Sequence, residues 1–108
     1  MGRHASRPRR GEEEEALMAV RWTTHAHRDL VRLHAFLVDV NPRAAARAVD
    51  VIIAGVKRLA AHPRLGRRLT EFDPLEVRSL VVADYEVRYE LRGRQLVVLR
   101  LWHVREDR

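Results

Sequence analysis

The sequence of 108 residues contains no cysteine, which excludes disulfide bonds, thiolate metal sites and a cysteine nucleophile. It also lacks the run of about 18 apolar residues that a membrane-spanning helix requires. It has neither a glycine-rich phosphate loop nor a Gly-x-Ser-x-Gly motif. Aromatic residues make up 6% of the chain, too few to interleave along strands as in an RNA-recognition sheet. The composition is that of a small globular protein, for which no membrane association is expected.

Positive charge is what the chain has in excess. It carries 21 Lys and Arg against 15 Asp and Glu, a formal net charge of +6. Such a surplus predicts an anionic partner, which could be a nucleic acid, an enzyme that handles nucleic acid or an acidic protein. Residues 1–17 combine four arginines with four consecutive glutamates and few apolar residues. We expect a disordered, solvated tail over residues 1–17 and one folded domain over residues 18–108.

Two adjacent segments carry apolar residues at spacings of three and four, which predicts two amphipathic helices. The residues of these stripes are Leu30, Leu33, Leu37 and Val40 in the first segment, and Ala45, Val49, Ile52, Val56 and Leu59 in the second. Thr23 or Thr24 is suited to cap the first helix, and Asn41-Pro42 to end it and begin the second. The second helix should end before His62-Pro63. With so short a connection, the two helices should form an antiparallel hairpin.

The rest of the chain has the pattern of strands. Ala19–Trp22 is a short apolar–polar run, and residues 63–75 form a loop with two prolines and a glycine. From residue 77 the period becomes two, with turns expected at Ala83-Asp84 and Gly93 and a central strand over residues 96–101. The predicted order is β-α-α-β-β-β. We expect an α+β fold in which the helical hairpin covers one face of a small, mainly antiparallel twisted sheet. The other face would carry the residues Glu86, Arg88, Glu90 and Arg92.

The histidines do not form a metal-binding pattern. His25 and His27 lie two residues apart, about 200° around a helix, so they cannot bind one ion together. His34 and His62 have no imidazole or carboxylate partner at ligand spacing. We therefore expect no metal site and no cofactor.

Basic residues are the main candidates for a functional site. Arg100 interrupts an otherwise apolar strand, so it should pair with an acid such as Glu76 or Glu90, or line a groove. His103 follows three residues later and could act as a general acid or base. The other candidates lie in the loop, on the next strand and at the end of the chain: Arg64, Arg67, Arg68, Arg78 and Arg105. An arginine-lined groove would suit a phosphate backbone and an anionic transition state, whereas the alternative is salt-bridge packing at the edge of the sheet.

Four segments, in this order and spacing, carry a resemblance to a known family. They are residues 62–67 (HPRLGR), 77–80 (VRSL), 85–89 (YEVRY) and 97–103 (VVLRLWH), the last running into 105–108 (REDR). The chain resembles the RelE/ParE superfamily of type II toxin–antitoxin toxins, often described as plasmid-stabilisation proteins. The resemblance implies the fold above and a cytoplasmic toxin that is neutralised by a cognate antitoxin. It also implies that operator DNA is contacted only through the antitoxin.

The resemblance leaves two activities open. RelE-like members are ribosome-dependent mRNA endonucleases, for which it implies Arg78, Arg100 and His103 as catalytic residues. ParE-like members inhibit DNA gyrase and need no hydrolytic residues. In either case the target or nucleic acid would be bound by Arg64, Arg67, Arg68 and Arg105. The sequence slightly favours the gyrase inhibitor, because no tyrosine follows Tyr89 and arginine is a poor base at neutral pH. The alternative is the endonuclease, which His103 alone supports.

Overall fold

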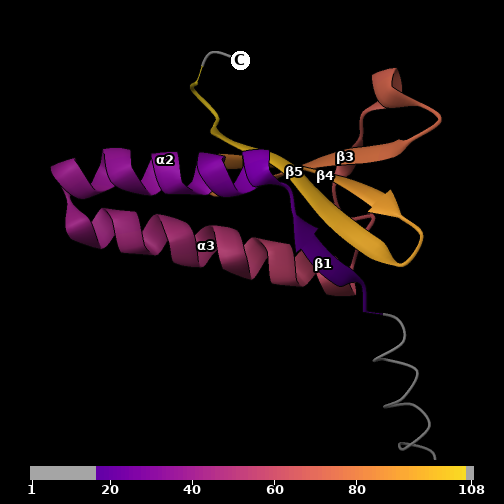
Figure 1. Ribbon diagram of the computed structural model, residues 1–108, viewed down its shortest axis with the longest axis horizontal. Coiled ribbons are helices and arrows are strands. Elements are labelled where there is room, and N and C mark those ends of the chain that lie inside the picture. Colours follow the sequence, from indigo (N-terminus) through magenta and orange to yellow (C-terminus); the bar gives the residue numbers. More distant parts are fainter. Residues whose placement is uncertain (1–16, 107–108) are drawn as a thin grey trace, which may run out of the picture.

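The computed structural model describes residues 17–106, so the predicted tail, apart from Leu17, lies outside the described residues. Strand β1 precedes two helices, and four further strands follow them with one 3-10 turn among them (Figure 1). The elements are β1 (Ala19–Trp22), α2 (Thr24–Val40), α3 (Pro42–Ala61), β2 (Arg67–Arg68), η2 (Thr70–Phe72), β3 (Glu76–Val82), β4 (Tyr85–Arg92) and β5 (Gln95–His103). The predicted order is confirmed, and the predicted loop at 63–75 contains β2 and η2 in addition.

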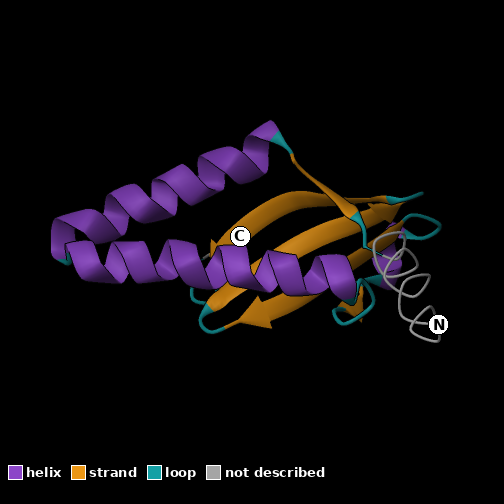
Figure 2. Ribbon diagram, turned by 90° about the horizontal axis from the view of Figure 1, so that it is seen from below, coloured by secondary structure: helices purple, strands orange, loops and turns teal. Residues whose placement is uncertain are grey.

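The strands form one sheet in the order β1-β5-β4-β3-β2. β1 runs parallel to β5, and the other neighbours are antiparallel. The α+β class and the mainly antiparallel sheet are therefore confirmed. Figure 2 shows the two helices crossing one side of the sheet, with the loop end of the hairpin reaching beyond the strands.

The predicted capping residues begin the two helices. The Thr23 hydroxyl oxygen accepts a hydrogen bond from the backbone N–H of Ala26 at 3.0 Å. The side-chain oxygen of Asn41 caps the second helix in the same way, accepting from the backbone N–H groups of Arg43 and Ala44. Since Pro42 has no N–H to satisfy at the first helical position, the chain reverses there without an unpaired donor.

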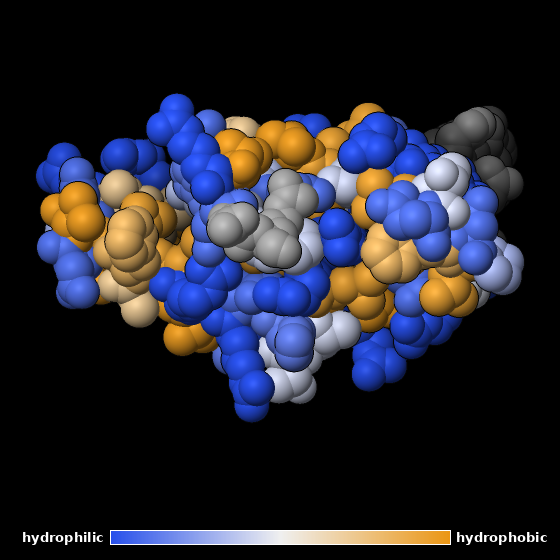
Figure 3. All heavy atoms as spheres, turned by 90° about the horizontal axis from the view of Figure 1, so that it is seen from above, coloured by the Kyte–Doolittle hydropathy of each residue, from blue (hydrophilic) through white to orange (hydrophobic). Residues whose placement is uncertain are grey.

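The hairpin projects past the sheet, and this changes the expected burial of its outer half. Leu33 is 5% exposed, but Val40, which was expected on the same buried stripe, is 74% exposed. Phe36 is 68% exposed. Hydrophobic side chains come to the surface over this part of the molecule, at the left of Figure 3. The expectation for Val40 was wrong because helical spacing places residues on a face without saying how far the covering layer extends.

The core lies between the helices and the sheet. Ile52 and Leu59 of α3 are fully buried there, together with Val98 and Leu101 of β5. Tyr89 of β4 is fully buried as well; its hydroxyl donates to the Pro63 carbonyl at 2.7 Å and accepts from the Gly66 N–H at 3.0 Å. These two bonds hold the loop that follows α3 against the sheet.

We predict that Tyr89→Phe lowers the free energy of unfolding by about 1–3 kcal/mol, because both loop groups lose a buried partner. Urea unfolding followed by circular dichroism measures this change. Tyr85→Phe is the matched control: it removes a hydroxyl from the same face of the same strand, but that hydroxyl does not hold the loop, so its effect should be smaller. Equal losses in the two variants would contradict this role for Tyr89.

Candidate functional site

Two of the predicted arginines meet at one glutamate beside the loop after α3. Glu76 accepts from Arg64 Nε and Nη2, both at 3.0 Å, and from Arg78 Nε at 2.9 Å. Arg78 also donates to the Gly66 carbonyl at 2.7 Å. Arg78 points to this loop because it shares the helix-facing side of β3 with Leu80, which packs against the core. Arg78 is therefore held within the fold through Nε and Nη1.

The ionised form of Glu76 is favoured in the folded protein. Burial raises the pKa of this carboxyl, but the hydrogen bonds from Arg78 and Arg64 and the charges of both guanidinium groups outweigh it. The net result is a pKa below the ordinary value. One carboxylate thus serves two arginines, and the cluster keeps a single positive charge.

Arg67 and Arg68 form the two-residue strand β2 at the end of the sheet. Arg68 pairs with Asp73 at 3.0 Å, and both side chains are largely open to solvent. An exposed pair of this kind contributes about 0–1 kcal/mol to stability. Arg67 lies opposite Ser79 of β3. The two neighbouring arginines therefore point to opposite faces of the sheet.

The acid that pairs with Arg100 is Asp29 of α2, so the expectation of Glu76 or Glu90 was wrong. Asp29 accepts from Arg100 Nε at 2.8 Å and from Nη2 at 3.2 Å. It also accepts from the backbone N–H of Leu101 at 2.9 Å. Asp29 is 5% exposed, so it enters the fold as a buried carboxylate with three donors.

This carboxylate belongs to a short row of side chains along the edge of β5. β1 pairs with β5 only as far as Val98, so the later edge groups of β5 need other partners. The Thr23 hydroxyl donates to the Leu99 carbonyl at 3.0 Å. Further along, the Leu101 N–H binds Asp29, and the His103 N–H donates to Glu106 at 2.8 Å. Side chains thus complete an edge that would otherwise be open to a further strand.

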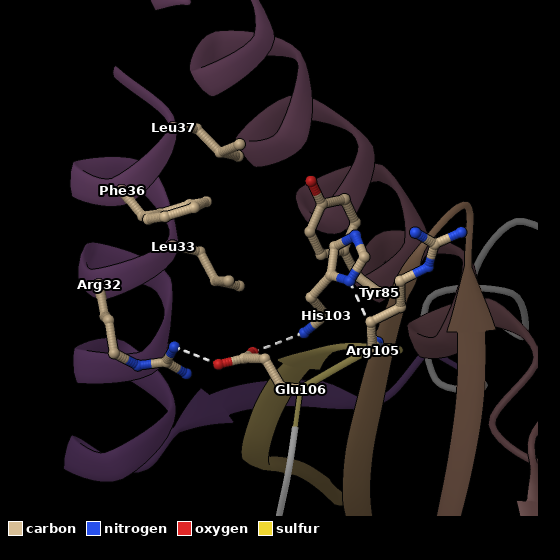
Figure 4. A pocket seen from close by; sticks show the side chains of 8 residues that line it. All are labelled: Arg32, Leu33, Phe36, Leu37, Tyr85, His103, Arg105 and Glu106. Carbon is tan, nitrogen blue, oxygen red and sulfur yellow. Dashed lines mark hydrogen bonds and ion pairs between the residues drawn. The ribbon is translucent and has the colours of Figure 1, made fainter. Parts of the chain in front are cut away.

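His103 lies at the end of β5, beside a pocket of about 500 Å³ between α2 and the sheet (Figure 4). Its Nδ1 accepts from the Arg105 backbone N–H at 3.1 Å, which places the proton of the neutral ring on Nε2. The ring meets the edge of Tyr85 at a centroid distance of 5.4 Å. The pocket is lined by Arg32, Leu33, Phe36, Leu37, Tyr85, His103, Arg105 and Glu106. Its floor is apolar, and Arg32 is held by ion pairs to Asp29 and Glu106.

The three predicted catalytic residues are not brought together. Arg100 lies opposite Arg88, on the sheet face away from the helices, whereas Arg78 lies on the helix-facing side. His103 aligns through Tyr85 with Val82, four residues along β3 from Arg78. The Cα atoms of Arg78 and His103 are thus separated by two strand spacings across the sheet and by four residues along it. Together these correspond to a distance of about 16 Å. Arg64, Arg68, Arg78 and Arg100 therefore belong to separate ion pairs and do not line one shared groove.

Sequence reasoning did not identify Arg88 as a candidate. Its guanidinium carbon lies 4.7 Å from the ring centre of Trp102 and 5.4 Å from that of Phe72. The alternation of β4 placed Arg88 on the correct face, but the bulge at Arg88/Tyr89 that aligns it with Arg100 leaves no signal in the sequence. The same face is less open than expected, since Glu86 and Glu90 are 7% and 6% exposed.

Two classes of site are absent from residues 17–106. No three histidine or acidic side chains in this range lie close enough together to hold a metal ion. None of the helices in the same range combines the length and hydrophobicity needed to cross a membrane.

Comparison with known proteins gives a consistent family. A family model described as the ParE toxin of the type II toxin–antitoxin system parDE matches residues 20–108. "Toxin RelE3" of Caulobacter vibrioides is 34% identical over 87 residues, which covers 77% of this chain and 90% of that protein. "Putative toxin Y4kP" of Sinorhizobium fredii is 34% identical over 92 residues, covering 82% of this chain and 90% of that protein.

Two solved structures share the fold. A chain of the chromosomal ParDE toxin–antitoxin system from P. aeruginosa has a TM-score of 0.68 at 25% identity, covering 82% of this chain and 97% of that one. A chain of the toxin–antitoxin complex RelBE2 from Mycobacterium tuberculosis has a TM-score of 0.56 at 27% identity, covering 81% and 98%. The likeness thus extends over nearly all of both solved chains.

We predict that Asp29→Asn lowers the free energy of unfolding by about 1–3 kcal/mol at neutral pH, because Arg100 loses its charged acceptor. Burial raises the pKa of Asp29. The hydrogen bonds from Arg100 and Leu101 and the charges of Arg100 and Arg32 outweigh this effect, so the net pKa lies below the ordinary 3.8. A lowered pKa means that this stabilisation is present above about pH 4 and is lost as the pH falls through the folded-state value.

Urea unfolding of both proteins between pH 7 and pH 3 measures this dependence. The difference between wild type and Asp29→Asn should be constant at neutral pH and shrink in the acid range. A difference that stays constant down to pH 3 would contradict the role given to the Asp29 carboxylate.

Proposed function

The chain belongs to the RelE/ParE superfamily of toxins from type II toxin–antitoxin systems, and we propose that it acts by binding and inhibiting DNA gyrase. A toxin of this kind has a cognate antitoxin as its partner. The net charge of +6 favours an acidic antitoxin. We further propose that operator DNA is contacted through the antitoxin and that the protein works in the cytoplasm.

The separation of the predicted catalytic residues is the observation that carries this proposal. Cleavage of RNA requires a proton-transfer group within reach of the cations that stabilise the phosphate in the transition state. His103 and Arg78 are about 16 Å apart by strand spacing, and Arg100 is on the other face of the sheet. Arg78 is bound within the fold by Glu76 and the Gly66 carbonyl, and Arg100 is bound by Asp29. A toxin that binds an enzyme needs none of this convergence.

The comparisons support the gyrase proposal unequally. The matching family model is that of ParE toxins, and the ParDE structure has the higher TM-score of the two quoted above. The curated relatives from Caulobacter vibrioides carry the name RelE. The arrangement of the arginines is therefore the stronger support.

One observation favours the endonuclease as a second candidate. His103 carries its proton on Nε2 in the neutral state, and its ring lines the pocket together with Arg105 (Figure 4). The imidazolium form, with a second proton on Nδ1, could donate its Nε2 proton to a leaving group and return to the neutral ring. Arg105 and His103 would then be the active pair, with Arg78 and Arg100 in structural roles.

We predict that the purified protein inhibits DNA supercoiling by gyrase and that His103→Ala inhibits to within about twofold of wild type. The physical reason is that a binding toxin has no proton to transfer at His103. The inhibition is measured on a gel, from the supercoiling of relaxed plasmid by gyrase and ATP. The control is the relaxation of supercoiled plasmid by a topoisomerase of a different mechanism, which the toxin should not inhibit.

The endonuclease gives the opposite pattern. It would leave supercoiling unaffected and would cut translated mRNA at codon-phased positions in a purified translation system. His103→Ala would lower that cutting by about 10²-fold to 10⁴-fold, the usual contribution of a general acid or base. Such cutting, with no effect on gyrase, would overturn the proposed function.

A further inference from the structure

A row of arginines crosses the sheet face that lies away from the helices. Arg100 of β5 is directly opposite Arg88 of β4, and Arg88 is directly opposite Ser79 of β3. Ser79 is in turn opposite Arg67 of β2. Directly opposite residues of antiparallel strands point to the same face, so Arg67, Arg88 and Arg100 share it. We call these three residues the arginine row.

Arg88 is held more firmly than an ordinary surface arginine. Its guanidinium lies near two aromatic rings, at 4.7 Å from the centre of Trp102 and 5.4 Å from that of Phe72. Arg100 contacts the same Trp102 ring at 5.1 Å. A guanidinium close to aromatic rings is held by cation–π attraction, and its planar set of N–H donors matches a carboxylate.

The hydrogen bonding of Arg88 is incomplete. Its Nε is buried and has no hydrogen-bond acceptor in residues 17–106. An unsatisfied buried donor is unfavourable and therefore requires an explanation. Arg88 and Arg100 are also like charges directly opposite each other, an unfavourable arrangement in a sheet. Asp29 offsets the charge of Arg100, but its hydrogen bonds go to Arg100 and Leu101.

We infer that Arg88 is an anchor for a carboxylate, the side chain of an aspartate or glutamate on the protein that this toxin inhibits. The inference rests on the proposed function, in which the target is a protein. Arg100, positioned by Asp29, lies on one side of the anchor and Arg67 on the other. Arg88 is half-buried, so an incoming carboxylate reaches its outer N–H groups and not the buried Nε. The bound anion offsets the repulsion between Arg88 and Arg100.

The same features disfavour a nucleic-acid backbone at this site. Binding to nucleic acid increases with the number of phosphates that lysines and arginines neutralise. In the arginine row, Arg100 is already paired with Asp29, and the buried Glu86 lies two residues from Arg88 on the same face. Trp102 is 7% exposed, so no base can stack on it. The row therefore suits one well-placed anion better than a chain of phosphates.

The test compares binding of purified gyrase to immobilised wild-type toxin and to Arg88→Gln. Glutamine removes the charge and the paired donors but keeps a planar polar group at this position. We expect Arg88→Gln to weaken binding by about 10-fold to 100-fold, as for the loss of a charged, paired hydrogen bond. Arg88→Lys should fall between the two, because it keeps the charge and loses the planar fork.

Arg92→Gln is the matched control. Arg92 lies on the same strand and the same face, and it pairs with Glu90 at 2.7 Å, outside the arginine row. Its loss removes the same charge from the protein and should change binding by less than about twofold. A cooperative thermal unfolding transition shows that each variant is folded. If Arg88→Gln does not fold, Arg88→Lys is compared with wild type instead.

The outcomes separate this inference from the proposed function. If wild-type toxin does not bind gyrase, the proposed function fails and the anchor fails with it. If wild type binds gyrase and a folded Arg88 variant binds equally well, only the anchor is wrong. Binding of a DNA duplex that is lost in Arg88→Gln, with gyrase binding unchanged, would assign the arginine row to nucleic acid and would also overturn the inference.

Discussion

The buried carboxylate of Asp29 is the contact on which the arrangement of helices and sheet depends. It binds the Arg100 side chain and the Leu101 N–H, two groups of β5 that lie 71 and 72 residues away in the sequence. A buried carboxylate without donors costs several kcal/mol, so α2 and β5 must meet at this point. Beyond it the hairpin extends past the sheet, which leaves Phe36 and Val40 exposed.

The same contact determines which parts of the sheet a partner can reach. Thr23, Asp29 and Glu106 bind the groups of β5 that continue beyond β1. This edge is therefore closed to a further strand, as protected edges in other sheets are. Partners are left with the faces and with the outer edges of β1 and β2. The apolar pocket beside His103 and the arginine row lie on opposite faces, so two different partners could be bound at separate places.

Local sequence patterns were sufficient for the helices and most strands. Asn41-Pro42 and the three-and-four spacing express rules that act within a few residues, and the structure follows them. β2 was missed because two residues are too few to show alternation. The partner of Arg100 was missed because nothing local connects it with Asp29, and the acids considered were those on the strands. Periodicity predicts which face a residue occupies, whereas register, bulges and long-range ion pairs decide what it meets there.

The distribution of acids explains why a basic chain does not have one basic groove. Several carboxylates are bound by arginines, as Glu76 is by Arg64 and Arg78, and Asp29 by Arg100. Each such pair uses donors that a bound phosphate would need. Counting arginines therefore overestimates how many phosphate groups the protein can bind. What counts is the guanidinium whose donors the fold does not satisfy. In the described chain the buried side-chain donor without an acceptor is Nε of Arg88, which strand alternation placed on the correct face and only the register distinguished from its neighbours.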